Sequence, residues 1–234
     1  MAFEFLILGA GRGGTSLLMA LLDAHSRIEV APEHASACLM DQSQGLADRV
    51  DAFKQACLED AGRYPDKTWG NKITTEQLGA LATGAPAPDV DMLSHFFNDA
   101  FASIKAIFIL RDGRTCVRSK VTRTGQSYET ACARWNYSVE VYKYLSHDPK
   151  RHLLVKFEDL LRTPSAVLSR ITAFLGIPYE DGMLSGTDSP KLPPGYRNST
   201  LKLDRSQVGP RADWHRLIDD NLRFCGYLPD PRSA

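Results

Sequence analysis

The chain has 234 residues, of which 43% are hydrophobic and 24% are charged, and its 28 basic and 28 acidic residues give a formal net charge of zero. This composition is typical of a globular protein, and the length predicts a single domain over residues 1–234. A neutral total excludes a nucleic-acid binder that works by bulk positive charge, so any anion site must be local.

The cysteines and the N-terminus restrict the protein class further. Five dispersed cysteines without a C-x-x-C pair argue against a disulfide framework and a structural zinc site, and no cluster of side chains has the spacing of metal ligands. The apolar stretch at Phe3–Leu8 is too short for a signal peptide or a membrane span. We therefore expect a cytoplasmic protein that uses no metal and no membrane.

The first predicted elements are a strand, a glycine loop and a helix. A continuous apolar run over Phe5–Leu8 predicts a strand that is buried on both faces. Leucines at helical spacing predict an amphipathic helix from Gly14 to about Ala24. The glycine-rich loop between them, Gly9–Ser16, places backbone N–H groups and a helix N-terminus where they can hold an anion.

The middle of the chain is predicted to be mainly helical. Residues 35–62 are polar without a strong strand pattern, Ser26–Val30 predicts at best a poor strand, and Thr83–Pro88 is rich in turn residues. We expect the helical segment of about residues 35–103 to face the substrate.

Two further strand and helix units follow. An apolar strand over Ala106–Leu110 leads into a helix that begins at Asp112. Another strand over His152–Phe157 leads to a helix that begins at Thr163-Pro164 and ends at Gly176.

The C-terminal part is predicted as a long loop over Gly182–Gly209 and a last helix over about Arg211–Cys225. Strands that alternate with helices predict an α/β fold, a three-layer, P-loop-like parallel sheet with helices on both faces. Ligands of such sheets bind at the carboxyl ends of the strands. The loops after Leu8 and Leu110, and the region of Lys72, should therefore converge.

The glycine loop has the spacing of a nucleotide P-loop at Gly9, Gly14 and Ser16, but Thr15 occupies the position of the lysine that reaches the phosphates. The loop cation is instead Arg12. A kinase-like nucleotide-binding protein is therefore an alternative rather than the favoured hypothesis. A dinucleotide-binding fingerprint also fits the glycines, but it needs a carboxylate at the end of a clear second strand, which the pattern does not predict.

Three stretches carry a more specific pattern. They are the loop and helix GAGRGGTSLLMALLDAH at residues 9–25, the stretch at residues 109–114 with Ser119, and VKFEDLL at residues 155–161 with Phe-Leu-Gly at residues 174–176. In order and spacing they resemble the motifs of sulfotransferases that use 3′-phosphoadenosine 5′-phosphosulfate (PAPS). The resemblance implies transfer of a sulfuryl group to a hydroxyl of a small-molecule, peptide or carbohydrate acceptor.

The resemblance also implies a set of cofactor-binding residues. In the loop they are Gly11, Arg12, Gly13, Gly14, Thr15 and Ser16, and at the 3′-phosphate they are Arg111 and Ser119. A guanidinium at a strand end and a hydroxyl on the following helix can hold one phosphate between them. The motifs depart from the family pattern where Gly11 and Gly13 replace a proline and a serine and where Gly113 replaces a proline.

For the transfer itself, the resemblance to the tyrosylprotein and carbohydrate branch implies two cations, Arg12 and Lys72, and one base, Glu33. His34 is the alternative base, and Ser206 resembles a serine that contacts the cofactor near its leaving oxygen. Cations and one base suffice for a loose, in-line transition state. A non-catalytic member of the fold that keeps the anion pocket is a further alternative.

Overall fold

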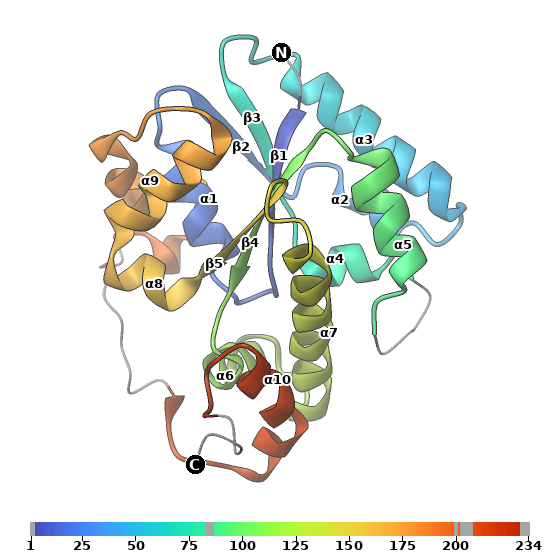
Figure 1. Ribbon diagram of the computed structural model, residues 1–234, viewed down its shortest axis with the longest axis vertical. Coiled ribbons are helices and arrows are strands. Elements are labelled where there is room, and N and C mark those ends of the chain that lie inside the picture. The colour runs from blue at the N-terminus through green and yellow to red at the C-terminus, as the bar shows by residue number, and fades with distance from the viewer. Residues whose placement is uncertain (1–2, 83–86, 199–200, 202–207, 230–234) are drawn as a thin grey trace.

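Five parallel strands form a sheet at the centre of the computed structural model (Figure 1), which describes residues 3–82, 87–198, 201 and 208–229. Their spatial order is β2-β3-β1-β4-β5. The strands are β1 (Phe3–Leu8), β2 (Ile28–Pro32), β3 (Thr68–Lys72), β4 (Lys105–Leu110) and β5 (His152–Lys156). This arrangement confirms the α/β class and the parallel sheet.

Strand β1 lies in the middle of the sheet and is buried on both faces. Phe5 and Ile7 belong to one hydrophobic core, and Leu6 and Leu8 belong to the other. Successive side chains of a strand point to opposite faces, so an uninterrupted apolar run supplies both cores at once. Burying each such side chain contributes about 1.5–3 kcal/mol.

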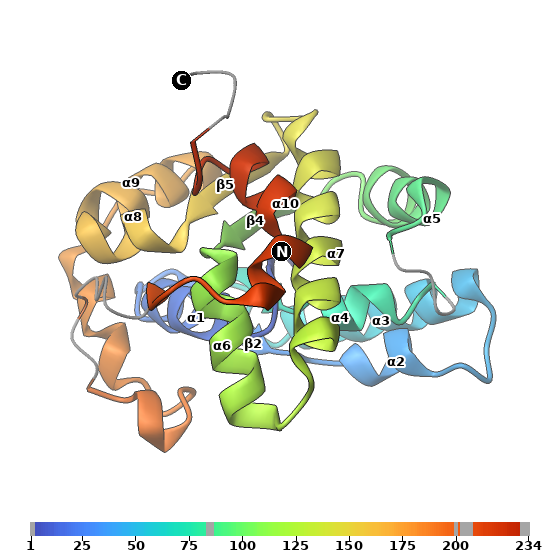
Figure 2. The same cartoon turned by 90° about the horizontal axis from the view of Figure 1, so that it is seen from below.

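Helices cover both faces of the sheet (Figure 1). One face packs against α1 (Thr15–Asp23), α8 (Phe157–Arg162) and α9 (Pro164–Leu175). The other face packs against the larger group, which is α3 (Leu46–Ala61), α4 (Thr75–Gly79), α5 (Val90–Ser94), α6 (Gly113–Thr124), α7 (Tyr128–Ser146) and α10 (Asp219–Phe224). Seen from below, α6, α7 and α10 lie in the centre of the view, between α8 and α9 on the left and α5 on the right (Figure 2).

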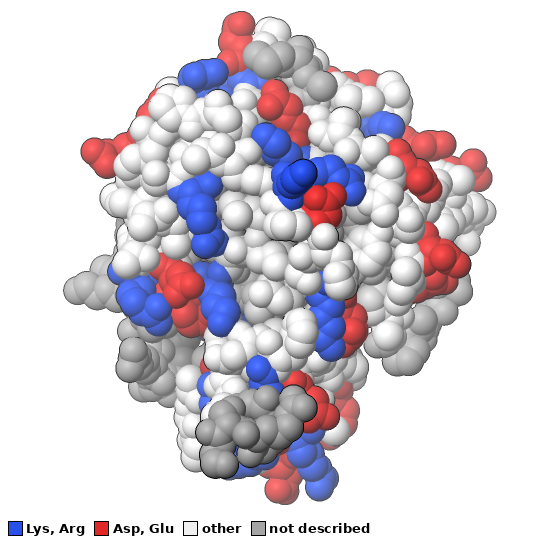
Figure 3. Space-filling view, in the orientation of Figure 1, with Lys and Arg blue, Asp and Glu red and all other residues white. Residues whose placement is uncertain are grey.

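Short elements complete the chain. They are α2 (Ser36–Met40), a π-helical turn at His95–Ala100, and 3₁₀ turns at Asp181–Asp188, Pro194–Tyr196 and Asp213–Leu217. No helix in the described part of the chain is long and apolar enough to cross a membrane. Basic and acidic side chains are interspersed on the face shown in Figure 3, in keeping with the neutral total.

The strands and helices predicted around β1, β4 and β5 are confirmed, but two strands differ from prediction. The stretch that predicted a poor strand forms β2, because it pairs along its whole length with β3 and buries Ile28 and Val30. Strand β3 was not predicted, since its sequence TWGNK carries no apolar run. Its Gly70 is required by packing, because a Cβ there would overlap the ring of Phe5.

The last helix is shorter than predicted. A 3₁₀ turn over Asp213–Leu217 comes first, and α10 follows from Asp219 to Phe224. Ile218 separates the two with a φ of −127°, outside the helical range. The His215 ring accepts a hydrogen bond from the Ala212 N–H at 3.0 Å, which fixes the tight turn.

Candidate anion-binding and catalytic site

The carboxyl ends of the strands place the candidate residues along one edge of the sheet. In spatial order the edge carries Glu33 after β2, Lys72 at the end of β3, the glycine loop after β1, Arg111 after β4 and Phe157 after β5. Residues far apart in the chain thus become neighbours, as parallel topology predicts. The glycine loop is at the centre, with a different set of side chains on each side.

The glycine loop turns sharply from β1 into α1. The Gly13 N–H donates to the Ala10 carbonyl at 2.7 Å, and a Cβ on Gly13 would lie 2.7 Å from that same oxygen. Gly14, the N-cap of α1, has a φ of 101°, and a Cβ there would overlap the Phe157 ring. Both positions therefore require glycine. The serine that the related motif carries at position 13 would not fit this turn.

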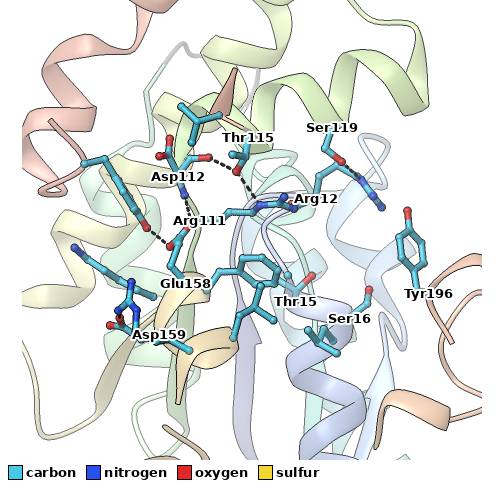
Figure 4. Close-up of a pocket in the computed structure, with 18 of the residues that line it drawn as sticks. Arg12, Thr15, Ser16, Arg111, Asp112, Thr115, Ser119, Glu158, Asp159 and Tyr196 are labelled. Carbon is cyan, nitrogen blue, oxygen red and sulfur yellow. Dashed lines mark hydrogen bonds and ion pairs between the residues drawn. The ribbon is translucent and has the colours of Figure 1, made fainter. Parts of the chain in front are cut away.

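Arg12 occupies the left-handed region with a φ of 72°, a strained backbone conformation for a side-chain-bearing residue. Its Nε donates to the Ser119 hydroxyl at 3.1 Å, and its guanidinium lies 5.0 Å from the centre of the Tyr196 ring (Figure 4). Within the described ranges, no carboxylate lies at ion-pair distance from Arg12. Its positive charge is therefore available to an anionic ligand.

Arg111 lies deeper, beside the same loop. Its Nε donates to the Thr115 hydroxyl at 2.9 Å and its Nη1 donates to the Arg12 carbonyl at 3.1 Å. The guanidinium carbon lies 4.7 Å from the centre of the Phe157 ring. Burial lowers the pKa of Arg111 below its ordinary value, but a guanidinium remains protonated in proteins. These contacts hold the Arg111 guanidinium in one orientation beside the glycine loop.

A cavity of about 780 Å³ opens beside these two arginines. This volume lies in the usual range of small-molecule sites. Its lining includes six of the predicted cofactor residues, namely Arg12, Gly14, Thr15, Ser16, Arg111 and Ser119. Gly11 and Gly13 are not part of the lining, so they shape the loop instead of facing the cavity.

Several side chains of this cavity were not predicted from the sequence. Arg123 lies one helical turn beyond Ser119 on α6, and its guanidinium is 5.0 Å from the Tyr196 ring. The i, i+4 spacing from Ser119 was the signal that could have identified it. Tyr196 comes from a 3₁₀ turn of the loop over residues 182–209, and no local pattern marks it.

The cavity lining includes a hydrogen-bonded carboxylate, that of Glu158. Glu158 accepts from the Asp112 N–H at 2.9 Å and from the Tyr227 hydroxyl at 2.8 Å. Burial and the neighbouring negative charge of Glu158 raise the pKa of Tyr227, so its hydroxyl stays a donor. Glu158 thereby connects the first turn of α8 with the start of α6 and with the C-terminal segment, and all three contribute residues to the cavity lining.

On the other side of the loop, Lys72 and Glu33 form an ion pair through Lys72 Nζ and Glu33 Oε1. Gln77 donates from its Nε2 to Glu33 Oε2 at 2.8 Å. The lysine side chain is 6% exposed and the glutamate side chain is 41% exposed, so the carboxylate is accessible while the ammonium is buried. Neither residue lines the cavity. Glu33 also has a φ of 59°, a second strained position among the candidate residues.

His34, the alternative base, makes hydrogen bonds within the fold through both its ring and its backbone. Its Nε2 lies 3.2 Å from the Ala56 carbonyl on α3, and Asn71 bonds to both its backbone N–H and its carbonyl. This favours Glu33 over His34 as the accessible proton acceptor. Ser206 lies outside the described residues, so its predicted role stays a prediction.

Comparisons with known proteins agree with these motifs. A family model described as the sulfotransferase family matches residues 4–181. The protein-tyrosine sulfotransferase of Drosophila melanogaster is 29% identical over 219 residues, which cover 86% of this chain and 43% of that protein. The chain spans about half the length of the curated relatives that it matches.

Solved structures share the fold. The sulfotransferase domain of the Synechococcus PCC 7002 olefin synthase gives a TM-score of 0.64 at 19% identity, over 93% of this chain and 94% of that one. A mouse sulfotransferase complexed with PAP gives a TM-score of 0.50 at 15% identity, over 94% and 84% of the two chains. At these identities the likeness concerns the fold.

Proposed function

Because the chain belongs to the sulfotransferase family, we propose that it transfers a sulfuryl group from PAPS to a hydroxyl group of an acceptor. The observation that carries the proposal is the arrangement along one sheet edge. A cavity lined by arginines lies on one side of the glycine loop, and a lysine paired with an exposed glutamate lies on the other. The arginine-lined cavity suits a polyanionic nucleotide, and the paired, exposed glutamate suits proton transfer.

The cavity residues are suited to a nucleotide that carries phosphates at both ends. Arg12 and the N-terminus of α1 would hold the 5′-phosphosulfate, and Arg111 with Ser119 would hold the 3′-phosphate. The aromatic side chains of Phe157, Tyr196 and Tyr227 in the same cavity offer apolar surface for the adenine. Glycine at position 14 lets the Phe157 ring pack directly against the start of α1.

Bound PAPS would supply an activated sulfuryl group, whose bond to the 5′-phosphate oxygen breaks as a bond to the acceptor oxygen forms. Glu33 would accept the proton of the acceptor hydroxyl, since its carboxylate is the accessible member of the pair. Lys72 holds one carboxylate oxygen and Gln77 the other, which orients the base. Arg12 and Lys72 would offset the negative charge that develops during transfer.

For the acceptor, we propose the phenolic hydroxyl of a tyrosine in a protein or peptide. This follows the curated relatives, whose names specify protein tyrosine. The exposed Glu33 carboxylate suits a hydroxyl that approaches from solvent. Small-molecule and carbohydrate hydroxyls are the competing acceptors, and the absence of a metal requirement stays a prediction.

The test is transfer of sulfur-35 from labelled PAPS to tyrosine-containing peptides, with phenols and sugars in parallel. We expect labelled peptide with the wild-type chain and none with Glu33→Gln. A chain that binds adenosine 3′,5′-bisphosphate but labels no acceptor in any of the three classes would favour the non-catalytic alternative. Phosphate transfer from magnesium ATP would favour the kinase-like alternative.

A further inference from the structure

The first turn of α4 contacts both sides of the site. Its Thr75 N–H donates to the Gly9 carbonyl at 3.0 Å, and Glu76 Oε2 accepts from the Gly11 N–H at 2.9 Å. The next residue, Gln77, donates to Glu33. Three successive residues thus join the glycine loop to the candidate base. Of these contacts, the one from Glu76 is the unexpected one, because it places a carboxylate against a loop that should attract anions.

A lysine accompanies this carboxylate. Lys120 Nζ pairs with Glu76 Oε1, and the lysine side chain is 4% exposed while the glutamate side chain is 22% exposed. The pair lies against Gly11, where a Cβ would come to 3.2 Å from Glu76 Oε1 and 3.4 Å from Lys120 Nζ. Lys120 also directly follows Ser119, the residue that holds Arg12.

The charges around the Glu76–Lys120 pair determine how the pair affects anion binding at the glycine loop. A carboxylate bonded to the loop backbone would by itself repel an anionic ligand of the same loop. Burial and the positive charges of Arg134 and Arg12 lower the pKa of Lys120 to about 7, so its charged form depends on the adjacent Glu76 carboxylate. The lysine therefore remains next to Glu76 as the counter-charge of that carboxylate.

We propose that Lys120 is a positioning residue that neutralises Glu76, so that this carboxylate can tether the glycine loop at Gly11 without repelling the anion bound beside Arg12. The proposal rests on the proposed function, because it concerns binding of the same nucleotide. A structural brace alone would be equally damaged by removing either partner. A counter-charge has opposite consequences for the two partners.

The test is calorimetric titration of adenosine 3′,5′-bisphosphate into four proteins, which are the wild type, Lys120→Met, Glu76→Gln and the double variant. We expect Lys120→Met to weaken binding about tenfold or more, because it leaves a carboxylate unpaired beside the anion. Glu76→Gln keeps an acceptor for the Gly11 N–H, so binding should stay equal or become tighter. The double variant should return to within about threefold of the wild type.

A matched control is the ion pair between Asp60, in the last turn of α3, and Arg63, just after that helix. Asp60→Asn and Arg63→Met should leave binding unchanged. Thermal unfolding of each variant checks folding. If Lys120→Met does not fold, Glu76→Gln decides alone, since weaker binding in that variant overturns the proposal.

Equal losses in both single variants, or a double variant as weak as Lys120→Met, would also overturn it. Failure of the wild-type chain to bind adenosine 3′,5′-bisphosphate would instead contradict the proposed function. The two failures are therefore distinguishable.

Discussion

The two sides of the glycine loop treat their cations differently. On the cavity side, Arg12 is held by the Ser119 hydroxyl and the Tyr196 ring, and Arg111 donates to the Thr115 hydroxyl and a backbone carbonyl. These contacts orient the two guanidinium groups beside the glycine loop. Both groups line the cavity, where they can contact an anionic ligand.

The lysines near the loop are paired instead. Lys72 pairs with Glu33 on the side away from the cavity, and Lys120 pairs with Glu76 against the loop itself. Each of these lysines has a carboxylate of the protein as its counter-charge. The comparison shows how a chain of zero net charge can hold a polyanion. It lines a local cavity with oriented arginines and pairs the neighbouring lysines with carboxylates.

The sharpest way to separate the two sides is Glu33→Gln. Loss of the base should reduce kcat by about 10²–10⁴-fold, because positioned general bases contribute that much. Binding of adenosine 3′,5′-bisphosphate should not change, since Glu33 does not line the cavity. Steady-state kinetics and calorimetry measure the two effects.

The matched control for Glu33→Gln is His34→Gln, because His34 is the neighbouring candidate base with committed ring contacts. It should retain kcat within about fivefold, the scale of one weakened neutral hydrogen bond. A larger loss in His34→Gln than in Glu33→Gln would assign the proton transfer to the histidine.

The converse change is Arg111→Met on the cavity side. Removing charge-assisted contacts to a phosphate should weaken binding of adenosine 3′,5′-bisphosphate by about 10–100-fold. In activity assays the loss should fall on the KM for PAPS more than on kcat. A variant that binds normally but turns over slowly would show that Arg111 belongs to the reacting side instead.

The smallest expected effect is that of Tyr196→Leu. The Tyr196 ring faces the guanidinium groups of Arg12 and Arg123, and loss of cation–π contacts at an exposed site should weaken nucleotide binding about two- to fivefold. Tyr196→Phe keeps the ring and should bind as the wild type does. If Tyr196→Phe binds the nucleotide as weakly as Tyr196→Leu does, the contribution to binding comes from the Tyr196 hydroxyl and not from its aromatic face.

The fold was predictable where the signal is local. The apolar run of β1, the glycines after it and the leucines of α1 are contiguous, and the structure confirms all three. Strands β2 and β3 were not predictable, because their pattern depends on partners elsewhere. In the sequence Gly70 argues against a strand. In the structure it belongs to β3, because the Phe5 ring occupies the space that a Cβ at this position would need.

The same distinction holds for the site. Arg12, Arg111 and Ser119 lie in motifs, and the structure brings them together at one cavity. Glu76 and Lys120 belong to no motif. Their proposed role depends on contacts with each other and with Gly11 that form only in the folded protein. The single domain, the cytoplasmic location and the role of Ser206 stay predictions.

The proposed function depends most on a cavity that recognises phosphates at both ends of an adenosine nucleotide. The direct measurement is a calorimetric comparison of adenosine 3′,5′-bisphosphate with adenosine 5′-monophosphate and with magnesium ATP. The bisphosphate should bind at least about tenfold tighter than the monophosphate, and Arg111→Met should abolish that difference. Equal binding of the monophosphate, or tighter binding of magnesium ATP, would contradict the account.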